Sequence, residues 1–376
     1  MKLDVIGKNI KRLREKNKIT QNELAQKLFV SFQAVSAWER GQAYPDLENI
    51  IKIAELFKVK IDTIINNTDS SLFVAIDGGG TKTEFVLFDK SGYIKKRILC
   101  TGANPNAIGI DKSISVLEDG LGRLFDEYSA KAVFAGIAGV STGDYIKVIS
   151  NMLSKKYSIP VNVNTDGINV LAMGKNPENT ASVICGTGSC IFIRKNYVLK
   201  RLGGWGNLFA PAGSAYKVGS DAICHTLAVN DGLETPTVLS KLVEEKLDGN
   251  IWQNLSSIYE KGVAYIASFA PLVTQAVDMG DKKALEILKQ NAKELSILIK
   301  FAREHFGAPD EFVCSGGFIK NSIFKDILEE ESGVSLYIPS SPPIYGACLE
   351  CLRLNGEKPD NDFINNFTES YRWLIC

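Results

Sequence analysis

The sequence is poor in histidine, has no long apolar run and carries no net charge. Its 376 residues include only two histidines, His225 and His305, which argues against a zinc site built on histidine. No apolar stretch approaches the roughly 18 residues of a membrane-spanning helix. The start, Met1-Lys2-Leu3-Asp4, lacks the apolar core of a signal peptide, so we expect a cytoplasmic protein with no membrane partner.

The cysteines do not form the pattern of a disulfide framework. All eight are scattered, mostly inside apolar runs, which favours reduced and buried thiols. Cys348 and Cys351 have the spacing of a redox or metal pair, but no second pair accompanies them and they lie in a helical pattern, so we interpret them as a core face. A Walker-type Gly-x-x-x-x-Gly-Lys motif is also missing, which excludes P-loop chemistry.

The length of the chain predicts two or three domains, and one polar stretch marks a boundary. Residues 66–71 show no apolar periodicity, and we expect a linker at 68–71. It separates an all-α domain, residues 1–67, from an alternating strand and helix pattern over 72–376. Residues 1–68 carry 12 Lys and Arg against 8 Asp and Glu, so the smaller block is the basic one.

The N-terminal block has the pattern of short helices around one small core. Thr20, Ser31 and Asp46 have the residue types and positions of helix N-caps, and Glu23 completes a capping box with Thr20. Two successive helices joined by about three residues have helix-turn-helix spacing. The predicted helices cover 4–17, 20–28, 31–39, 46–57 and 61–65, and the predicted core is Ile6, Ile10, Leu13, Leu24, Leu28, Val35, Trp38, Ile50, Ile53, Ala54 and Phe57.

Residues 5–65 resemble the Cro-type (XRE, lambda-repressor-like) DNA-binding domain. The match includes Thr-Gln-x-Glu-Leu-Ala from residue 20 and Val-Ser-x-x-x-Val-Ser-x-Trp-Glu-Arg-Gly from residue 30. The resemblance implies that Ser31 through Ala37 form a recognition helix in double-stranded DNA and that Lys11 and Gln42 contact phosphates. The candidate DNA-binding residues are Gln21 on the backbone, Ser31, Phe32, Gln33 and Ser36 toward the bases, and Arg40 on phosphate.

Two observations qualify this resemblance. Phe29 stands where the family usually has a glycine in the turn, and we expect it to be tolerated if its φ angle is not positive, although it could alter the angle of the recognition helix. The modest positive charge leaves open a small helical protein-interaction domain instead. Because helix-turn-helix modules usually bind symmetric half-sites, we also expect a homodimer.

Residues 72–88 contain an apolar strand that runs into three consecutive glycines. Glycines 78–80 allow positive φ angles, so their N–H groups can approach a polyphosphate. Asp77 ends the strand and can hold a metal's water shell, while Thr81 and Thr83 can donate to phosphate oxygens. A tight β-hairpin is the alternative interpretation, but three glycines exceed what a two-residue turn needs.

A second hairpin repeats this pattern at residues 181–194. Its turn is Gly186-Thr187-Gly188-Ser189, and two such hairpins could hold a nucleotide's phosphates from both sides. Between the hairpins, 132–139 and 160–166 are predicted to be buried parallel strands, which place ligands at their carboxyl ends. Asp166 is therefore a candidate active-site residue, unless it only caps the next helix.

At these residues the chain resembles the acetate kinase, hexokinase, Hsp70 and actin superfamily. Over 72–356 it is most similar to the N-acetylglucosamine kinase and BadF/BadG/BcrA/BcrD-type ATPase branch. Besides the two hairpins, the matching motifs begin at Gly203, Gly213, Ser315 and Pro343. The resemblance implies a ribonuclease-H-like, duplicated, actin-like α/β domain with one lobe at about 72–177 and another at about 178–376.

The resemblance also implies phosphoryl transfer from ATP, with Mg²⁺, to an amino-sugar hydroxyl. Asp166 matches the catalytic base, Asp77 the metal-binding residue, and Asn104 the sugar-binding asparagine. Gly204 and Trp205 join Asp166 and Asn104 at the sugar. The implied nucleotide and phosphate-binding residues are Gly79, Gly80, Thr81, Lys82, Thr83, Gly186, Thr187, Gly188, Ser189, Gly316 and Gly317.

One departure from the family pattern keeps two functions open. Where the family has two acids that bind sugar hydroxyls, this chain has Pro211 and Ala212. Losing a charged partner to a hydroxyl costs about 1.5–3 kcal/mol. The chain is either a DNA-binding sugar kinase or a transcriptional regulator whose kinase-like domain senses sugar, sugar phosphate or nucleotide without turnover. The branch's iron–sulfur activators are a weaker match, because Cys100, Cys185 and Cys190 lie in predicted strands.

Overall fold

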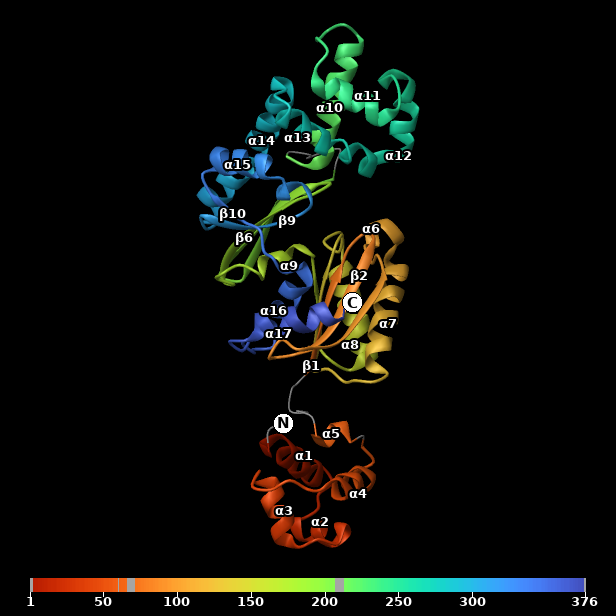
Figure 1. The fold of residues 1–376 in the computed structure, drawn as a ribbon, viewed down its shortest axis with the longest axis vertical. Helices are drawn as coiled ribbons and strands as arrows, with labels where there is room; N and C mark the ends of the chain where they lie inside the picture. Colours follow the sequence, from red (N-terminus) through yellow and green to blue (C-terminus); the bar gives the residue numbers. More distant parts are fainter. Residues whose placement is uncertain (1–2, 60, 66–71, 207–212, 375–376) are drawn as a thin grey trace. The chain divides into compact units, whose positions relative to one another are not determined.

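The computed structural model describes residues 3–59, 61–65, 72–206 and 213–374, in two compact units, Met1–Leu72 and Phe73–Cys376 (Figure 1). The predicted linker at 68–71 lies outside the described residues. Within the described residues, no helix is long and apolar enough to cross a membrane. The smaller unit contains α1 (Leu3–Lys16), α2 (Gln21–Leu28), α3 (Phe32–Glu39), α4 (Leu47–Phe57) and α5 (Asp62–Ile65).

The helix starts of the smaller unit are fixed by the predicted caps. Thr20 Oγ1 accepts a hydrogen bond from the Glu23 N–H at 3.2 Å, and the Glu23 carboxylate accepts one from the Thr20 N–H at 2.6 Å, which completes the capping box. Ser31 and Asp46 cap α3 and α4 with their side-chain oxygens, which accept hydrogen bonds from the N–H groups of Ala34 and Asn49. The predicted core residues are buried in one cluster, except that Phe57 is only partly buried at its edge.

Phe29, in the turn between α2 and α3, has the positive φ angle that we expected it to avoid. Phe29 has φ 58° and ψ 41°, the left-handed conformation that a glycine would adopt without strain. Its N–H still bonds to Gln26 O, and its side chain is 91% exposed. The chain therefore tolerates a positive φ at a phenylalanine in this turn, and the packing of α2 and α3 supplies the stability that holds it there.

The larger unit begins with a five-stranded sheet in the order β3-β2-β1-β4-β5. The first three strands form antiparallel hairpins, and β4 and β5 run parallel to β1, as predicted for 132–139 and 160–166. The strands are β1 (Leu72–Gly78), β2 (Lys82–Asp89), β3 (Ile94–Thr101), β4 (Ala132–Ile137) and β5 (Val161–Asn164), and the intervening helices are α6 (Pro105–Ile108), α7 (Ile110–Phe125) and α8 (Tyr145–Tyr157).

A second sheet repeats this topology in the order β10-β9-β6-β7-β8. Again a double hairpin is followed by two strands parallel to its first strand, so the unit is a structural duplication. Its strands are β6 (Asn179–Cys185), β7 (Ser189–Lys195), β8 (Val198–Gly203), β9 (Glu311–Ser315) and β10 (Ser335–Tyr337), preceded by α9 (Gly167–Leu171).

Helices cover both sheets (Figure 1). α7 and α8 pack on one face of the first sheet, and α16 (Pro343–Leu354) and α17 (Phe363–Trp373) pack on the other. The second sheet contacts α14 (Lys282–Phe306) and α15 (Ser322–Ser332). The remaining elements are α10 (Ala215–Asn230), α11 (Val238–Leu247), η1 (Ile251–Asn254), α12 (Leu255–Ala267), α13 (Ala270–Asp278) and η2 (Phe318–Lys320).

Alternate residues of β7 enter different cores. Ile191 and Ile193 lie in the core of the second sheet with α10 to α15, whereas Phe192 lies in the core shared by the first sheet, α9 and α16. Cys348 and Cys351 are fully buried on α16, which confirms them as a core face. The chain thus returns to the first sheet after completing the second, and the lobe limits of 72–177 and 178–376 remain a prediction.

A buried ion pair also joins β7 to α16. Arg194 donates to Glu350 at 3.0 Å, with side chains only 3% and 5% exposed, and Arg353 donates to the same carboxylate at 2.6 Å. Burial lowers the pKa of Arg194 against the opposing effect of Glu350. Breaking such a pair leaves a buried charge without a partner, so this contact fixes where α16 lies against the second sheet.

We predict that Phe29→Gly stabilises the smaller unit by about 1 kcal/mol, because glycine adopts a left-handed conformation without the strain of a Cβ atom. The exposed phenylalanine ring loses little packing in the exchange. Native-state hydrogen exchange of the α2 and α3 amides in the full chain measures the change.

Phe29→Ala is the matched control, because it removes the ring and keeps the positive φ. An alanine gain equal to the glycine gain would show that the ring, and not the backbone, is the source of the strain.

Candidate functional site

The candidate site lies where the parallel strands of the first sheet end. Asp77 of β1 pairs in register with Gly136 of β4, and Gly136 pairs with Asn164 of β5. The chain after β5 turns back at once, since the Asp166 N–H bonds to Ile137 O at 3.3 Å. This register places the two predicted carboxylates, Asp77 and Asp166, at one edge of the sheet.

Asp77 is a half-buried carboxylate with one strong partner. Asn169 Nδ2 on α9 donates to Asp77 Oδ1 at 2.6 Å. Burial raises the pKa of Asp77 to about 6, and the charge of Asp166 adds to this, while the Asn169 hydrogen bond opposes it. A cation next to Asp77 would offset the free-energy cost of removing its charge from water, so this carboxylate is suited to bind a metal ion.

Asp166 does not serve as the cap of the helix that follows it. It occupies the N-cap position of α9 but its side chain makes no capping hydrogen bond, and Thr165 Oγ1 donates to its Oδ1 at 3.0 Å. Burial raises the pKa of Asp166 above its ordinary value. A carboxylate with a raised pKa is better suited to accept a proton near neutral pH. Its assignment as the base stays a prediction.

Asn104 lies beside the same strand ends. Its Oδ1 accepts a hydrogen bond from the Asn106 N–H at 2.9 Å, which caps α6, and a Cβ atom on Gly139 would lie only 2.1 Å from that oxygen. Gly139 follows β4, so Asn104 packs against the loop at the carboxyl end of that strand. The side-chain oxygen Oδ1 of Asn104 is engaged in the cap. Its side-chain nitrogen Nδ2 is therefore the group suited to donate to a sugar hydroxyl.

The first glycine turn is held by the backbone around it. The Gly79 N–H bonds to Lys82 O at 2.9 Å, and Gly79 O accepts from the Ala103 N–H at 3.1 Å. Gly80, Thr81 and Lys82 are exposed at the tip of this hairpin. Thr83 differs from the other predicted phosphate ligands, because its side chain is fully buried and its hydroxyl has no hydrogen-bond partner. In this conformation the Thr83 hydroxyl cannot reach a phosphate.

The second hairpin lies beside the turn that carries the predicted nucleotide-binding residues Gly316 and Gly317. Gly316 has φ 117°, and a Cβ atom on it would lie 2.2 Å from Cys185 O, so only glycine lets β9 end this close to β6. A pocket of about 660 Å³ opens here. Its lining includes Gly186, Thr187, Gly317 and residues of η2, α12 and α13. Gly188 is exposed, whereas Ser189 is largely buried.

Gly204, which follows β8, lies against Cys190 of β7. A Cβ atom on Gly204 would lie 2.8 Å from Cys190 Cβ, and the charge of Asp166 contributes, after burial, to a Cys190 pKa of about 12. Gly204 therefore packs directly against the Cys190 side chain. Trp205 is 61% exposed, with the Arg201 guanidinium 4.3 Å from its ring centroid. Pro211 and Ala212 lie outside the described residues.

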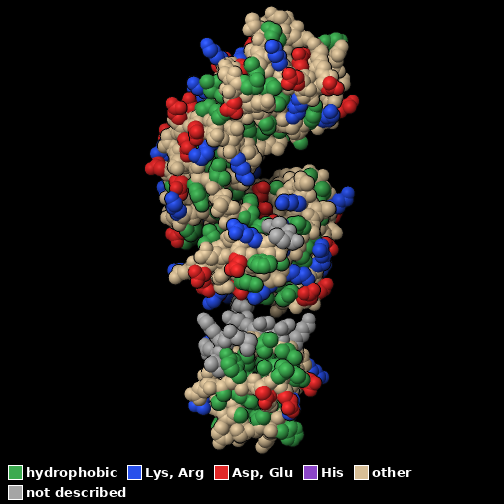
Figure 2. Space-filling view, in the orientation of Figure 1, with side chains coloured by type: hydrophobic (Ala, Val, Ile, Leu, Met, Phe, Trp, Pro, Cys, Tyr) green, Lys and Arg blue, Asp and Glu red, His purple; other side chains and the backbone are tan. Residues whose placement is uncertain are grey.

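The surface of the larger unit is hollowed between the pocket beside the second hairpin and the loop that carries Asn104. Figure 2 shows the hollow between the region of α12, which lines the 660 Å³ pocket, and the region of α6, where Asn104 lies. The described residues contain no group of three or more His, Cys, Asp or Glu side chains that could hold a metal ion. Asp77 stays the predicted residue for holding the water shell of a Mg²⁺ ion, a metal that is often bound through one or two carboxylates and substrate phosphates.

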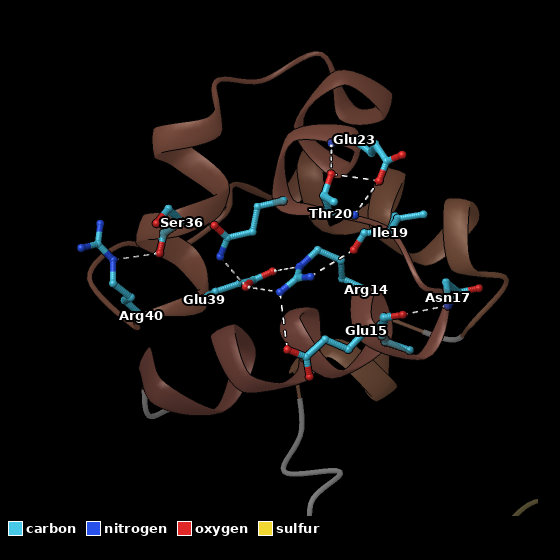
Figure 3. A network of polar contacts seen from close by, with 11 residues as sticks. Arg14, Glu15, Asn17, Ile19, Thr20, Glu23, Ser36, Glu39 and Arg40 are labelled. Atoms are coloured by element: carbon cyan, nitrogen blue, oxygen red, sulfur yellow. Dashed lines mark hydrogen bonds and ion pairs between the residues drawn. The ribbon is translucent and has the colours of Figure 1, made fainter.

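In the smaller unit, one buried carboxylate joins three helices (Figure 3). Glu39 of α3 accepts hydrogen bonds from Arg14 of α1 at 2.6 and 3.0 Å, and from Gln21 Nε2 of α2 at 2.7 Å. Arg14 also donates to Ile19 O at 3.0 Å. The two-pronged contact raises the pKa of Arg14. Glu39 thus fixes the helix-turn-helix geometry and orients the Gln21 amide, which retains a second N–H.

The predicted DNA-reading side chains project from α3 and its ends. Ser31, Phe32, Gln33 and Arg40 are exposed, and Ser36 is half-buried. The Arg40 Nε donates to Ser36 O at 3.2 Å, which draws that guanidinium back along the helix (Figure 3). Lys11 and Gln42, the further predicted phosphate contacts, are exposed as well.

Sequence reasoning missed two residues of these sites. Asn169 has no motif around it, and its role rests on a contact across 92 positions. Glu39 lies inside the recognised motif, but its bridging of α1 and α2 depends on how three helices pack. The spacing of Asp166 and Asn169, three positions apart at the start of a helix, was the one available signal for Asn169.

Fold and site together define a helix-turn-helix unit followed by a duplicated two-sheet unit with a candidate nucleotide site. The sequence model of the BadF/BadG/BcrA/BcrD ATPase family matches residues 74–351, and a helix-turn-helix model matches 10–64. The chain belongs to the BadF/BadG/BcrA/BcrD ATPase family.

Several known proteins are similar to the larger unit. The N-acetyl-D-glucosamine kinase of Dictyostelium discoideum is 28% identical, over 76% of this chain and 99% of its own. The N-acetylmuramic acid/N-acetylglucosamine kinase of Clostridium acetobutylicum is 30% identical, over 66% of this chain and 85% of its own.

A solved structure shares the fold of the larger unit. The putative N-acetylglucosamine kinase of Chromobacterium violaceum has a TM-score of 0.62 at 22% identity, covering 74% of this chain and 98% of its own. The predicted actin-like duplicated fold is thereby confirmed.

The smaller unit is similar to the HTH-type transcriptional activator BcrR of Enterococcus faecalis, 36% identical over 17% of this chain and 31% of that protein.

We predict that Gly316→Ala weakens nucleotide binding at least about tenfold, because the new Cβ atom forces the turn away from Cys185 O and out of the pocket. Calorimetric titration with ATP measures the affinity.

Gly333→Ala is the matched control. Gly333 also has a positive φ, 67°, but no atom lies within 4 Å of the added Cβ, and it caps α15 at a distance from the pocket lining. The alanine there strains the backbone and leaves the affinity unchanged. Equal affinities for both variants and the wild type would contradict the role of the 316–317 turn.

Proposed function

We propose that this chain is a DNA-binding protein whose larger unit is an ATP-dependent sugar kinase of N-acetylglucosamine kinase type, which transfers the γ-phosphoryl group of ATP to an amino-sugar hydroxyl. The observation that carries the proposal is the state of Asp166: a strand-end carboxylate with a raised pKa that makes no capping bond to its own helix. The names of two matched relatives, an N-acetyl-D-glucosamine kinase and an N-acetylmuramic acid/N-acetylglucosamine kinase, support the choice of sugar.

The residues of the site divide the chemistry between them. Asp166 accepts the proton of the sugar hydroxyl as the bond to phosphorus forms. The side-chain nitrogen of Asn104 donates to the sugar, and Gly204 and Trp205 contact the sugar from the side of the second sheet. The exposed tips of the two turns, at 80–81 and 187–188, meet the phosphates, since the Gly79 and Gly186 N–H groups are bonded within the turns. Gly316 and Gly317 admit the adenosine. Mg²⁺ held near Asp77 would neutralise charge on the transferred phosphoryl group.

The smaller unit is proposed to bind double-stranded DNA. Gln21, oriented by Glu39, and Arg40 contact the backbone, while Phe32, Gln33 and Ser36 face base edges. A glutamine pairs with adenine through two hydrogen bonds, and a phenylalanine ring contacts the thymine methyl group. We further propose a cytoplasmic homodimer, whose two α3 helices would occupy symmetric half-sites.

A sensor without turnover is the second candidate. The observation in its favour is the replacement of two family acids by Pro211 and Ala212, since it removes charged partners of the sugar hydroxyls and leaves the phosphate residues in place. Binding without catalysis would then regulate the DNA-binding unit.

We predict that Asp166→Asn lowers sugar-stimulated ADP release by about 100-fold or more, because the amide cannot accept the proton. The assay uses a panel of amino sugars with saturating Mg²⁺ and ATP. Asp119→Asn, a surface aspartate paired with Arg123, is the control and should keep the wild-type rate.

Wild-type protein that binds an amino sugar measurably but releases no additional ADP would reject the kinase and leave the sensor.

A further inference from the structure

Asn169 is a fully buried polar residue that the proposed chemistry does not use. It lies on α9, three positions after Asp166, so both residues belong to the first turn of one short helix. Its Nδ2 donates to Asp77 Oδ1 at 2.6 Å, whereas its own Oδ1 has no hydrogen-bond partner. Leaving one buried amide oxygen unsatisfied costs free energy, which the bond to Asp77 has to offset.

The path of the Asn169 side chain depends on one glycine. Gly136 lies on β4, between Asp77 on β1 and Asn164 on β5. A Cβ atom on Gly136 would lie 2.0 Å from Asn169 Oδ1, and 2.5 Å from both Cγ and Nδ2. The amide therefore lies flat against the backbone of β4 and crosses this strand to reach the carboxylate on β1.

The backbone of Asn169 is held from the other side by α16. A Cβ atom on Gly346 would lie 1.7 Å from Asn169 O, so α16 crosses α9 in direct contact at this residue. Gly167, two positions earlier, lies against the Phe192 ring of β7. The position of Asn169 is thus fixed by elements of both sheets, and it transmits that position to Asp77.

We infer that Asn169 is a positioning residue for Mg·ATP: it fixes the Asp77 carboxylate by holding Oδ1, so that Oδ2 can face the metal and its water shell. The inference rests on the proposed function, since it takes Asp77 as the metal-binding residue. Asn169 itself does not touch nucleotide or sugar.

The test compares binding of the non-hydrolysable analogue AMPPNP with and without Mg²⁺, by calorimetry on the full chain. Asn169→Leu keeps the shape of the side chain and removes the donor. We expect its affinity for Mg·AMPPNP to fall about tenfold, and its affinity for AMPPNP in EDTA to change less than about threefold.

Asn291→Leu is the matched control. Asn291 is also fully buried, donates to a carboxylate, Asp221 at 2.8 Å, and has an unpartnered Oδ1, but it lies on α14. It should lose a comparable amount of stability in chemical denaturation and keep the wild-type effect of Mg²⁺. Gly136→Ala provides a second route, because its Cβ atom displaces the Asn169 amide without altering Asn169, and it should reproduce the loss.

An Asn169→Leu variant, or a Gly136→Ala variant, that keeps the full effect of Mg²⁺ on AMPPNP binding would overturn the inference and leave the kinase proposal intact. Wild-type protein that binds no AMPPNP under either condition would overturn both.

Discussion

The register of three parallel strands is the constraint on which the site depends. Asp77, Gly136 and Asn164 lie side by side across β1, β4 and β5, so the carboxylate of β1 and the turn after β5 end at one edge. Because backbone hydrogen bonds set this register, a slip of one residue would turn Asp77 to the other face of the sheet. The glycine in the middle strand then leaves room for a side chain to pass between the outer two.

The duplicated topology gives each sheet a glycine turn after its first strand. Each sheet begins with a double hairpin whose turn carries glycine and hydroxyl residues, and each is completed by two parallel strands. α9 connects the two halves: its first turn carries Asp166 and Asn169, and its packing surfaces meet β7 and α16. A movement between the sheets would therefore displace Asp166 directly and Asp77 through its hydrogen bond to Asn169. This is a physical basis for coupling ligand binding to conformation.

Local chemistry explains what could be predicted from the sequence. Helix starts in the smaller unit follow from hydroxyl and carboxylate caps, and the structure places them at Thr20, Ser31 and Asp46. The strand-glycine-strand patterns predicted both hairpins, because turn residues and apolar strand residues determine local structure over a few positions. The burial of Thr83 was missed, since a threonine on a strand next to a turn can face either side.

Contacts between distant segments explain what could not be predicted. Asn169 meets Asp77 only after α9 has packed beside β4, and α16 joins the first sheet although it follows the second in the chain. The positive φ of Phe29 likewise results from the packing of α2 against α3, which outweighs the local preference of phenylalanine. Sequence patterns carry only weak signals of such contacts, because the contacts arise from tertiary packing.

Anomalous diffraction from crystals of the protein with Mn²⁺, AMPPNP and an amino sugar tests the central claim most directly. The account predicts Mn²⁺ between the Asp77 carboxylate or its waters and the nucleotide phosphates. It also predicts a sugar hydroxyl within about 2.6–3.2 Å of the Asp166 carboxylate. A nucleotide bound away from the turns at 78–81 and 186–189, or a sugar out of reach of Asp166, would contradict it.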